Sequence, residues 1–107
     1  MRVISTKITN NLSIVKFELD EFIIKTESFE FKNIDETKQS PLAKQLFFLP
    51  FVKTVYISGN FIAIEKFSIV EWEDVQDDVA NQINEFIANG GEILLIDETQ
   101  NKKQPIN

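Results

Sequence analysis

The sequence of 107 residues lacks cysteine and histidine altogether. Without cysteine the chain forms no disulfide and offers no thiolate to a metal, and without histidine it offers no imidazole ligand. Cysteine nucleophiles and catalytic triads built on histidine are excluded for the same reason. The glycines, which are Gly59, Gly90 and Gly91, form no phosphate-binding loop. We therefore expect no enzyme, and no cofactor or metal bound by this chain.

Long apolar runs are also missing. Residues 1–11 lack the apolar stretch of a secretory signal peptide, and no stretch of about 18 apolar residues exists to span a bilayer. We therefore expect a cytoplasmic protein with no membrane association.

Basic residues are scarce in the second half of the chain. The net charge is −6, and no Lys or Arg occurs between Phe67 and Asn101. An acidic surface repels phosphate backbones, so we expect no nucleic-acid partner.

The remaining composition is that of a soluble globular protein, with 43% hydrophobic and 26% charged residues. The length suits one core. We predict a single domain over residues 1–97, followed by a polar tail or interdomain linker over residues 98–107.

The stretch SPLAKQLFFLP, residues 40–50, has the clearest helix signals. Ser40 is a favourable N-cap, and Pro41 suits the first helical position, where its missing N–H is not needed. The leucines that follow recur at the spacing of one helical face. Because Pro50 cannot continue a helix, we predict a helix over residues 41–49.

A second helix is predicted by an apolar stripe at helical spacing. Ser68 with Glu71 matches a capping box before the stripe, and Gly90 is placed to end the helix in a left-handed conformation. The stripe consists of Trp72, Val75, Val79, Ile83, Phe86 and Ile87.

Strands are predicted where β-branched and aromatic residues gather or alternate with polar ones. Gly59 and Asn60 tolerate the positive φ of a short hairpin loop. The predicted strands cover residues 12–17, 21–25 and 28–33, a hairpin over 51–67, and a last strand over 92–96. The order β-β-α-β-β-α-β predicts an α+β fold, a mostly antiparallel sheet with two helices packed on one face.

An acidic cluster begins the second helix: Glu71, Glu73, Asp74, Asp77 and Asp78. Three interpretations are open. The carboxylates favour the positive end of the helix dipole and face solvent, they form a docking patch for a basic partner, or they hold a hard cation weakly.

Two aromatic residues near the end of the first helix are also candidates. Phe48 projects away from the face that carries Leu49, and an exposed aromatic beside Phe51 is typical of a partner site. The alternative is that both pack under a neighbouring loop.

The central stretch over residues 40–66 resembles the N-terminal domain of Nfu-type (NifU-like) iron–sulfur cluster scaffold proteins. That family has a Ser-Pro-Leu-Ala-x-x-Leu-Phe helix followed by a hydrophobic hairpin. The matching residues are Ser40, Pro41, Leu42, Ala43, Leu46 and Phe47 in the helix, and Val52, Val55, Tyr56, Asn60, Phe61, Ile62 and Lys66 in the hairpin. Trp72-Glu73 and Lys16-Phe17 also fit, although two prolines that usually precede the Lys-Phe pair are absent.

The resemblance implies a non-catalytic accessory domain of an assembly scaffold. In the family, the cluster is held by a Cys-x-x-Cys motif on a separate C-terminal domain, which this sequence does not contain. The implied partners are proteins of iron–sulfur assembly or apo-clients. The alternative is a stand-alone domain that binds a small ligand or associates with itself.

Overall fold

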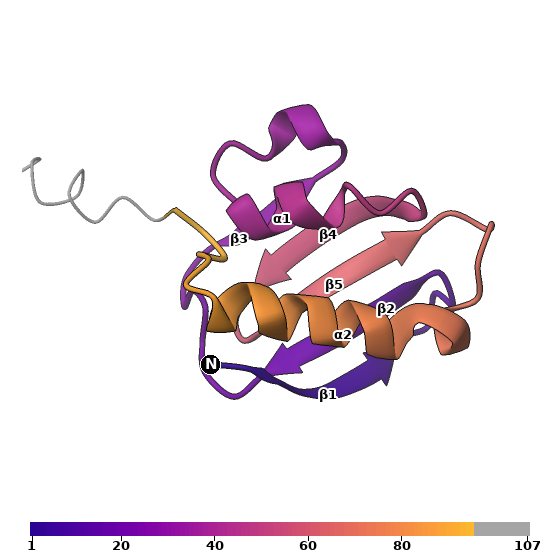
Figure 1. Cartoon of the computed structure of the whole chain (residues 1–107), viewed down its shortest axis with the longest axis horizontal. Coiled ribbons are helices and arrows are strands. Elements are labelled where there is room, and N and C mark those ends of the chain that lie inside the picture. Colours follow the sequence, from indigo (N-terminus) through magenta and orange to yellow (C-terminus); the bar gives the residue numbers. More distant parts are fainter. Residues whose placement is uncertain (96–107) are drawn as a thin grey trace, which may run out of the picture.

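Residues 1–95 are described by a computed structural model, and they form an antiparallel sheet with helices on one side (Figure 1). The five strands lie in the order β1-β2-β5-β4-β3. In chain order the elements are β1 (Val3–Ile8), β2 (Ile14–Leu19), β3 (Ser28–Phe31), the 3-10 helix η1 (Ile34–Glu36), α1 (Pro41–Leu46), β4 (Val52–Ser58), β5 (Phe61–Lys66) and α2 (Trp72–Ala88). The predicted α+β class is confirmed, while the predicted domain end at residue 97 and the tail over 98–107 lie outside the described residues.

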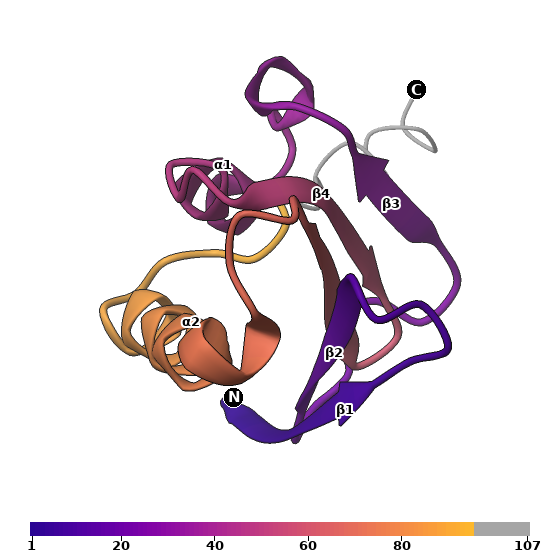
Figure 2. The same cartoon turned by 90° about the vertical axis from the view of Figure 1, so that its right-hand side faces the viewer.

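Both helices cover the same face of the sheet (Figure 2). The strands point large apolar side chains toward this layer, and the other face carries mostly polar residues. The largest fully buried side chains include Phe17, Leu19, Leu42, Leu46, Ile57, Ile62, Ile64 and Ile83. Trp72 joins the two layers, because its ring meets Phe17 edge-on at 5.8 Å while its indole N–H donates to the carbonyl of Ser13 at 2.8 Å.

The N-terminal strand β1 is missing from the sequence-based prediction. It pairs with β2 in the first hairpin, whose loop is held by the Thr9 hydroxyl donating to the carbonyl of Asn11 at 2.8 Å. β1 is an edge strand that buries little: Ile4 is 57% exposed and Ile8 is 76% exposed. It therefore lacks the apolar alternation by which a half-buried strand is recognised.

Residues 21–25 do not form the predicted strand. The backbone N–H groups of Ile23 and Ile24 donate to the carbonyl of Gly59, at 2.8 and 3.3 Å. These residues therefore bind the loop of another hairpin instead of joining a ladder, and their apolar side chains pack against the core.

The central hairpin is confirmed. β4 and β5 are joined through Gly59, whose φ of +56° is the left-handed conformation that glycine adopts without strain. One face of β5 lies under the helices, since Ile62 and Ile64 are fully buried.

The last predicted strand is wrong for the residues that the structure describes. Residues 92–95 pair with no strand, and Ile96 lies outside the described residues. The segment instead crosses from α2 to the start of α1 (Figure 2). There the Ile93 carbonyl accepts a hydrogen bond from the Ser40 hydroxyl at 2.6 Å, and the Leu95 N–H donates to the Gln39 carbonyl at 2.7 Å.

The start of α1 is as predicted, with Pro41 first and the Ser40 side chain accepting from the Ala43 N–H at 2.9 Å. The helix ends at Leu46 rather than at residue 49. The N–H groups of Phe48 and Leu49 donate three residues back, which tightens the chain into turns before Pro50.

The predicted end of α2 is confirmed and its predicted capping box is wrong. Gly90 has φ of +91°, and the Gly91 N–H donates to the Phe86 carbonyl at 2.9 Å, as in a Schellman motif. At the other end Ser68 lies in a turn ahead of the helix, and Glu71 is the N-cap without a side-chain capping bond. No helix in residues 1–95 has the length and apolar character needed to cross a membrane.

Candidate functional site

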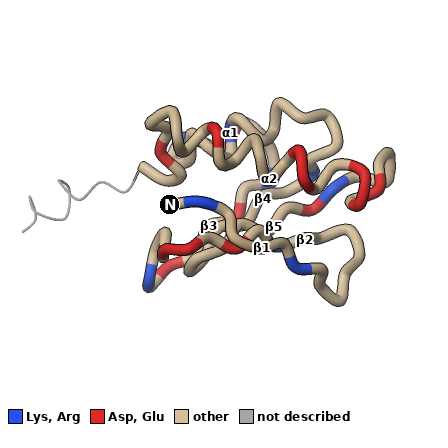
Figure 3. Tube along the Cα trace, turned by 60° about the horizontal axis from the view of Figure 1, so that its bottom comes forward, with Lys and Arg blue, Asp and Glu red and all other residues tan. Residues whose placement is uncertain are grey.

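The acidic residues predicted as a patch lie at the start of α2, and all of them are exposed (Figure 3). Glu73 and Asp77 are neighbours on the helix surface, as are Asp74 and Asp78, because residues four apart share a face. Glu73 and Asp74 belong to the first turn, where the helix dipole favours negative charge. The dipole accounts for these two carboxylates but not for the pair one turn further along.

None of these carboxylates has a cationic partner in residues 1–95, where the ion pairs within 4.0 Å involve Glu18, Glu21 and Glu65 only. α2 itself contains no Lys or Arg. The carboxylates also do not converge, since no group of three or more potential metal ligands is found in the described part of the chain. The patch is thus a negative surface without internal neutralisation.

The uncovered face of the sheet contrasts with this patch. There the Lys7 Nζ atom lies 3.8 Å from Glu18 Oε1, and the Lys53 Nζ atom lies 3.8 Å from Glu65 Oε2. Lys16 lies over the ring of Phe61, 4.6 Å from its centroid. Each of these three lysines therefore has a carboxylate or an aromatic ring as a neighbour within the chain.

The two aromatic candidates have different environments. Phe48 is 61% exposed, so it remains available for contact with a partner. Phe51 is only 9% exposed and meets Trp72 edge-on at 6.2 Å. Of the two alternatives, packing within the chain describes Phe51, whose side chain lies against Trp72, whereas Phe48 is exposed.

A small cavity of about 130 Å³ lies between the turn after α1 and α2. Its lining consists of Leu49, Phe51, Val75, Asp78, Val79 and Gln82. The side-chain oxygen of Gln82 is shielded from solvent and has no hydrogen-bond partner in the described residues. We call this cavity together with Asp74 and Asp78 the α2 groove. The α2 groove therefore combines an apolar cavity with two residues of the acidic patch.

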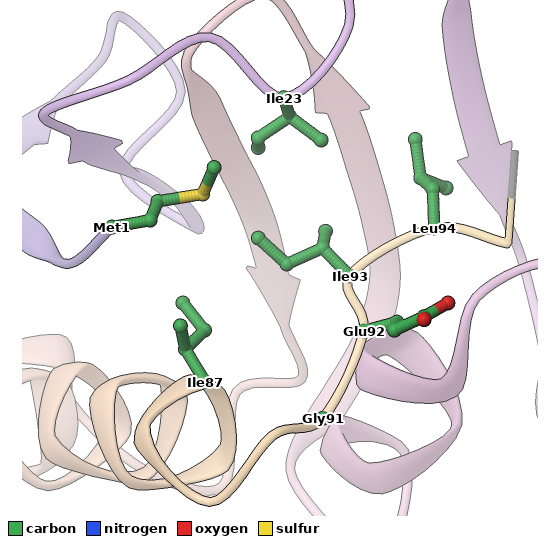
Figure 4. Close-up of a pocket in the computed structure, with 7 residues that line it drawn as sticks. All are labelled: Met1, Ile23, Ile87, Gly91, Glu92, Ile93 and Leu94. Carbon is green, nitrogen blue, oxygen red and sulfur yellow. The ribbon is translucent and has the colours of Figure 1, made fainter.

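A second, larger cavity of about 260 Å³ lies at the other end of α2 (Figure 4). Met1, Ile23, Ile87 and Ile93 point toward a common space, while the carboxylate of Glu92 points away from it. The side chains that point into this cavity are therefore apolar.

The sequence gives no direct sign of the lining residues Leu49, Val75 and Val79 beyond their place in apolar stripes. Such stripes predict contact with the core. Whether a residue of a stripe borders a cavity depends on the position of the turn after α1. That position is set by the tertiary structure and cannot be read from the sequence pattern.

Comparisons with known proteins agree with this fold. The family model described as "Scaffold protein Nfu/NifU N terminal" matches residues 4–90. The solution structure of a NifU-like protein from Saccharomyces cerevisiae superposes with a TM-score of 0.71 at 27% identity, covering 88% of this chain and 87% of that one. The crystal structure of SAV1430 from Staphylococcus aureus, at 24% identity, has the same fold, with a TM-score of 0.67 over 78% of this chain and 99% of that one.

Curated relatives include the mitochondrial NFU1 iron–sulfur cluster scaffold homologs of Drosophila willistoni and Homo sapiens. The fly protein is 34% identical over a region that covers 85% of this chain and 32% of the fly protein. The human protein is 31% identical over a region that covers 81% of this chain and 35% of the human protein. The chain thus spans about a third of the length of these relatives. The prediction of a cytoplasmic protein is contradicted, since these relatives, like NifU-like protein 5 of Arabidopsis thaliana, are mitochondrial.

Proposed function

Because this chain belongs to the Nfu/NifU N-terminal family of scaffold proteins, we propose that it is a non-catalytic interaction domain in iron–sulfur cluster assembly. In this proposal the domain contacts assembly proteins or the apo-proteins that receive clusters. The cluster itself is cargo, carried by a Cys-x-x-Cys domain elsewhere in a longer polypeptide.

One observation carries the proposal: a member of a cluster-scaffold family has neither cysteine nor histidine. Iron–sulfur clusters are held by thiolates, with imidazole as the usual substitute. A chain with neither side chain contributes to assembly through protein contacts. The relatives, which are about three times as long, leave room for a cluster-binding part.

The exposed surface around α2 supports a role in contact. Phe48 is an exposed aromatic residue. The acidic patch at the start of α2 has no ion pair within residues 1–95, whereas Glu18 and Glu65 on the sheet each have one. Aromatic residues are enriched among those that dominate interface energies.

A site-specific crosslinking experiment tests the proposal. A photoreactive phenylalanine analogue is placed at residue 48 and, as a matched control, at the exposed Glu30 on β3. We expect the crosslinks from position 48, and not those from position 30, to be enriched in cluster-assembly proteins and apo-proteins with cluster-ligating cysteines. Partners without any relation to iron–sulfur proteins would contradict the proposal. So would stoichiometric iron and sulfide on this chain after anaerobic reconstitution.

A further inference from the structure

The α2 groove combines an apolar cavity with carboxylates that have no partner in the described part of the chain. We propose that it binds a basic amphipathic segment of a partner protein, with apolar side chains in the cavity and Lys or Arg side chains along α2. This inference rests on the proposed function, because it names the surface and the partner chemistry of the interaction domain.

The cavity has the size of a single amino-acid side chain rather than of a small-molecule ligand. Pockets for small molecules enclose about 300–1,000 Å³, whereas this cavity encloses about 130 Å³. Leu49, Val75 and Val79 supply aliphatic walls, and Phe51 supplies a ring. Such a cavity suits a Leu, Met or Phe side chain projecting from a peptide.

Two exposed aromatic residues belong to the chain segments that border the cavity. Phe48 adjoins Leu49 in the chain and is 61% exposed. The Phe67 N–H donates to the Phe51 carbonyl at 2.8 Å, which brings the segment before α2 to the same place, and Phe67 is 46% exposed. Both rings are exposed and are therefore available for contact with a partner segment.

The acidic residues of α2 at the groove indicate that the partner segment is positively charged. Asp78 lines the cavity and Asp74 lies one turn away on the same helix face. No Lys or Arg of residues 1–95 pairs with either carboxylate. Lys and Arg fit this arrangement, because their aliphatic stems cover apolar surface while their charged ends reach the carboxylates. An acidic segment would instead be repelled.

Gln82 also lines the groove. Its side-chain oxygen is shielded from solvent without a hydrogen-bond partner in the described residues.

A peptide titration tests the inference. The probe is a synthetic peptide of about 16 residues, with Leu at i, i+4 and i+7 and Lys at most other positions. One control peptide carries Glu in place of every Lys, and another carries Ser in place of every Leu. Binding to the full chain is followed by NMR and by the fluorescence of Trp72, the single tryptophan, whose ring contacts Phe51. We expect saturable binding of the probe, about tenfold or more tighter than that of either control.

Two variants of the protein locate the site. Asp74→Lys with Asp78→Lys reverses charge at the groove, and Glu27→Lys with Glu30→Lys makes the same change in net charge at exposed positions on the β3 side. We expect the first variant to weaken probe binding about tenfold and the second to change it less than about twofold. Circular dichroism confirms that both variants remain folded.

Each other outcome overturns the inference. Failure of the probe to saturate at millimolar concentration shows that the groove does not take such a segment. Equal losses in both variants show attraction to net charge alone, and undiminished binding of the Ser peptide shows that the cavity is not used. None of these results bears on crosslinking to iron–sulfur proteins, so the groove and the proposed function fail separately.

Discussion

The hydroxyl of Ser40 donates to the carbonyl oxygen of Ile93 at 2.6 Å, although the two residues are 53 positions apart in the chain. The same hydroxyl oxygen accepts a hydrogen bond from the Ala43 N–H at 2.9 Å. One fully buried side chain thus caps α1 and fixes the segment that follows α2.

Ser40→Ala is expected to lower the free energy of unfolding by about 2–3 kcal/mol. Loss of an N-cap contributes about 1 kcal/mol, and the buried Ile93 carbonyl left without its donor contributes about as much or more. Urea denaturation followed by circular dichroism measures the difference. Ser68→Ala is the matched control, because Ser68 is exposed and caps nothing, and its effect should stay within about 0.5 kcal/mol. A larger effect at Ser68 than at Ser40 would contradict the capping described here.

The two phenylalanines of the turn after α1 are expected to respond oppositely to truncation. Phe51→Ala should destabilise the fold by about 3 kcal/mol, since its buried ring packs against Trp72. Phe48→Ala should change stability by less than about 0.5 kcal/mol, because the ring is mostly exposed. Thermal and chemical denaturation measure both effects. Similar losses would show that Phe48 is also part of the core.

Asp78→Lys is expected to stabilise the isolated chain by about 0.5 kcal/mol. The change removes the repulsion with Asp74 and creates an oppositely charged pair at i, i+4 in the favourable order. The gain should disappear in about 1 M NaCl, where the Debye length falls to about 3 Å. Melting temperatures at low and high salt measure it. Destabilisation at low salt would mean that Asp78 has a structural role that its exposure does not suggest.

Asn84→Ala is expected to loosen the N-terminal strand. The side-chain oxygen of Asn84 on α2 accepts from the Val3 N–H at 2.7 Å, and this bond ties the edge strand β1 to the helix layer. We expect a loss of about 1 kcal/mol and faster hydrogen exchange at the Val3 amide. Asn81→Ala, at an exposed position on the same helix, is the control and should leave that amide protected. An unchanged hydrogen-exchange rate of the Val3 amide in the Asn84 variant would show that this hydrogen bond does not hold β1 to α2.

The parts of the fold that sequence predicts are those with local signals. The Ser40-Pro41 start of α1, the Gly59 turn and the Gly90 end of α2 each depend on residues adjacent in the chain. Backbone conformation and capping at such positions follow from the residue type, so no tertiary information is needed.

The parts that were not predicted depend on contacts between distant segments. Ile93 and Leu94 are both buried, and a short apolar run does not distinguish a strand from an irregular segment held by Ser40. β1 stays hidden because an edge strand buries few of its side chains. The acidic patch was found from composition, but its cavity was not, since Leu49 and Val75 come together only in the folded chain.

The strand order has a consequence for how quickly the chain folds. β1–β2 and β4–β5 are hairpins that close over short loops, whereas β2 meets β5 through pairs as distant in sequence as Ile14 and Glu65. Closing a long loop costs entropy before any contact compensates for it. We therefore expect the two hairpins to form early and their joining at the middle of the sheet to be the rate-limiting step. In that case the folding nucleus contains the pairing between β2 and β5, in which Phe17 lies opposite Ile62 and Val15 lies opposite Ile64.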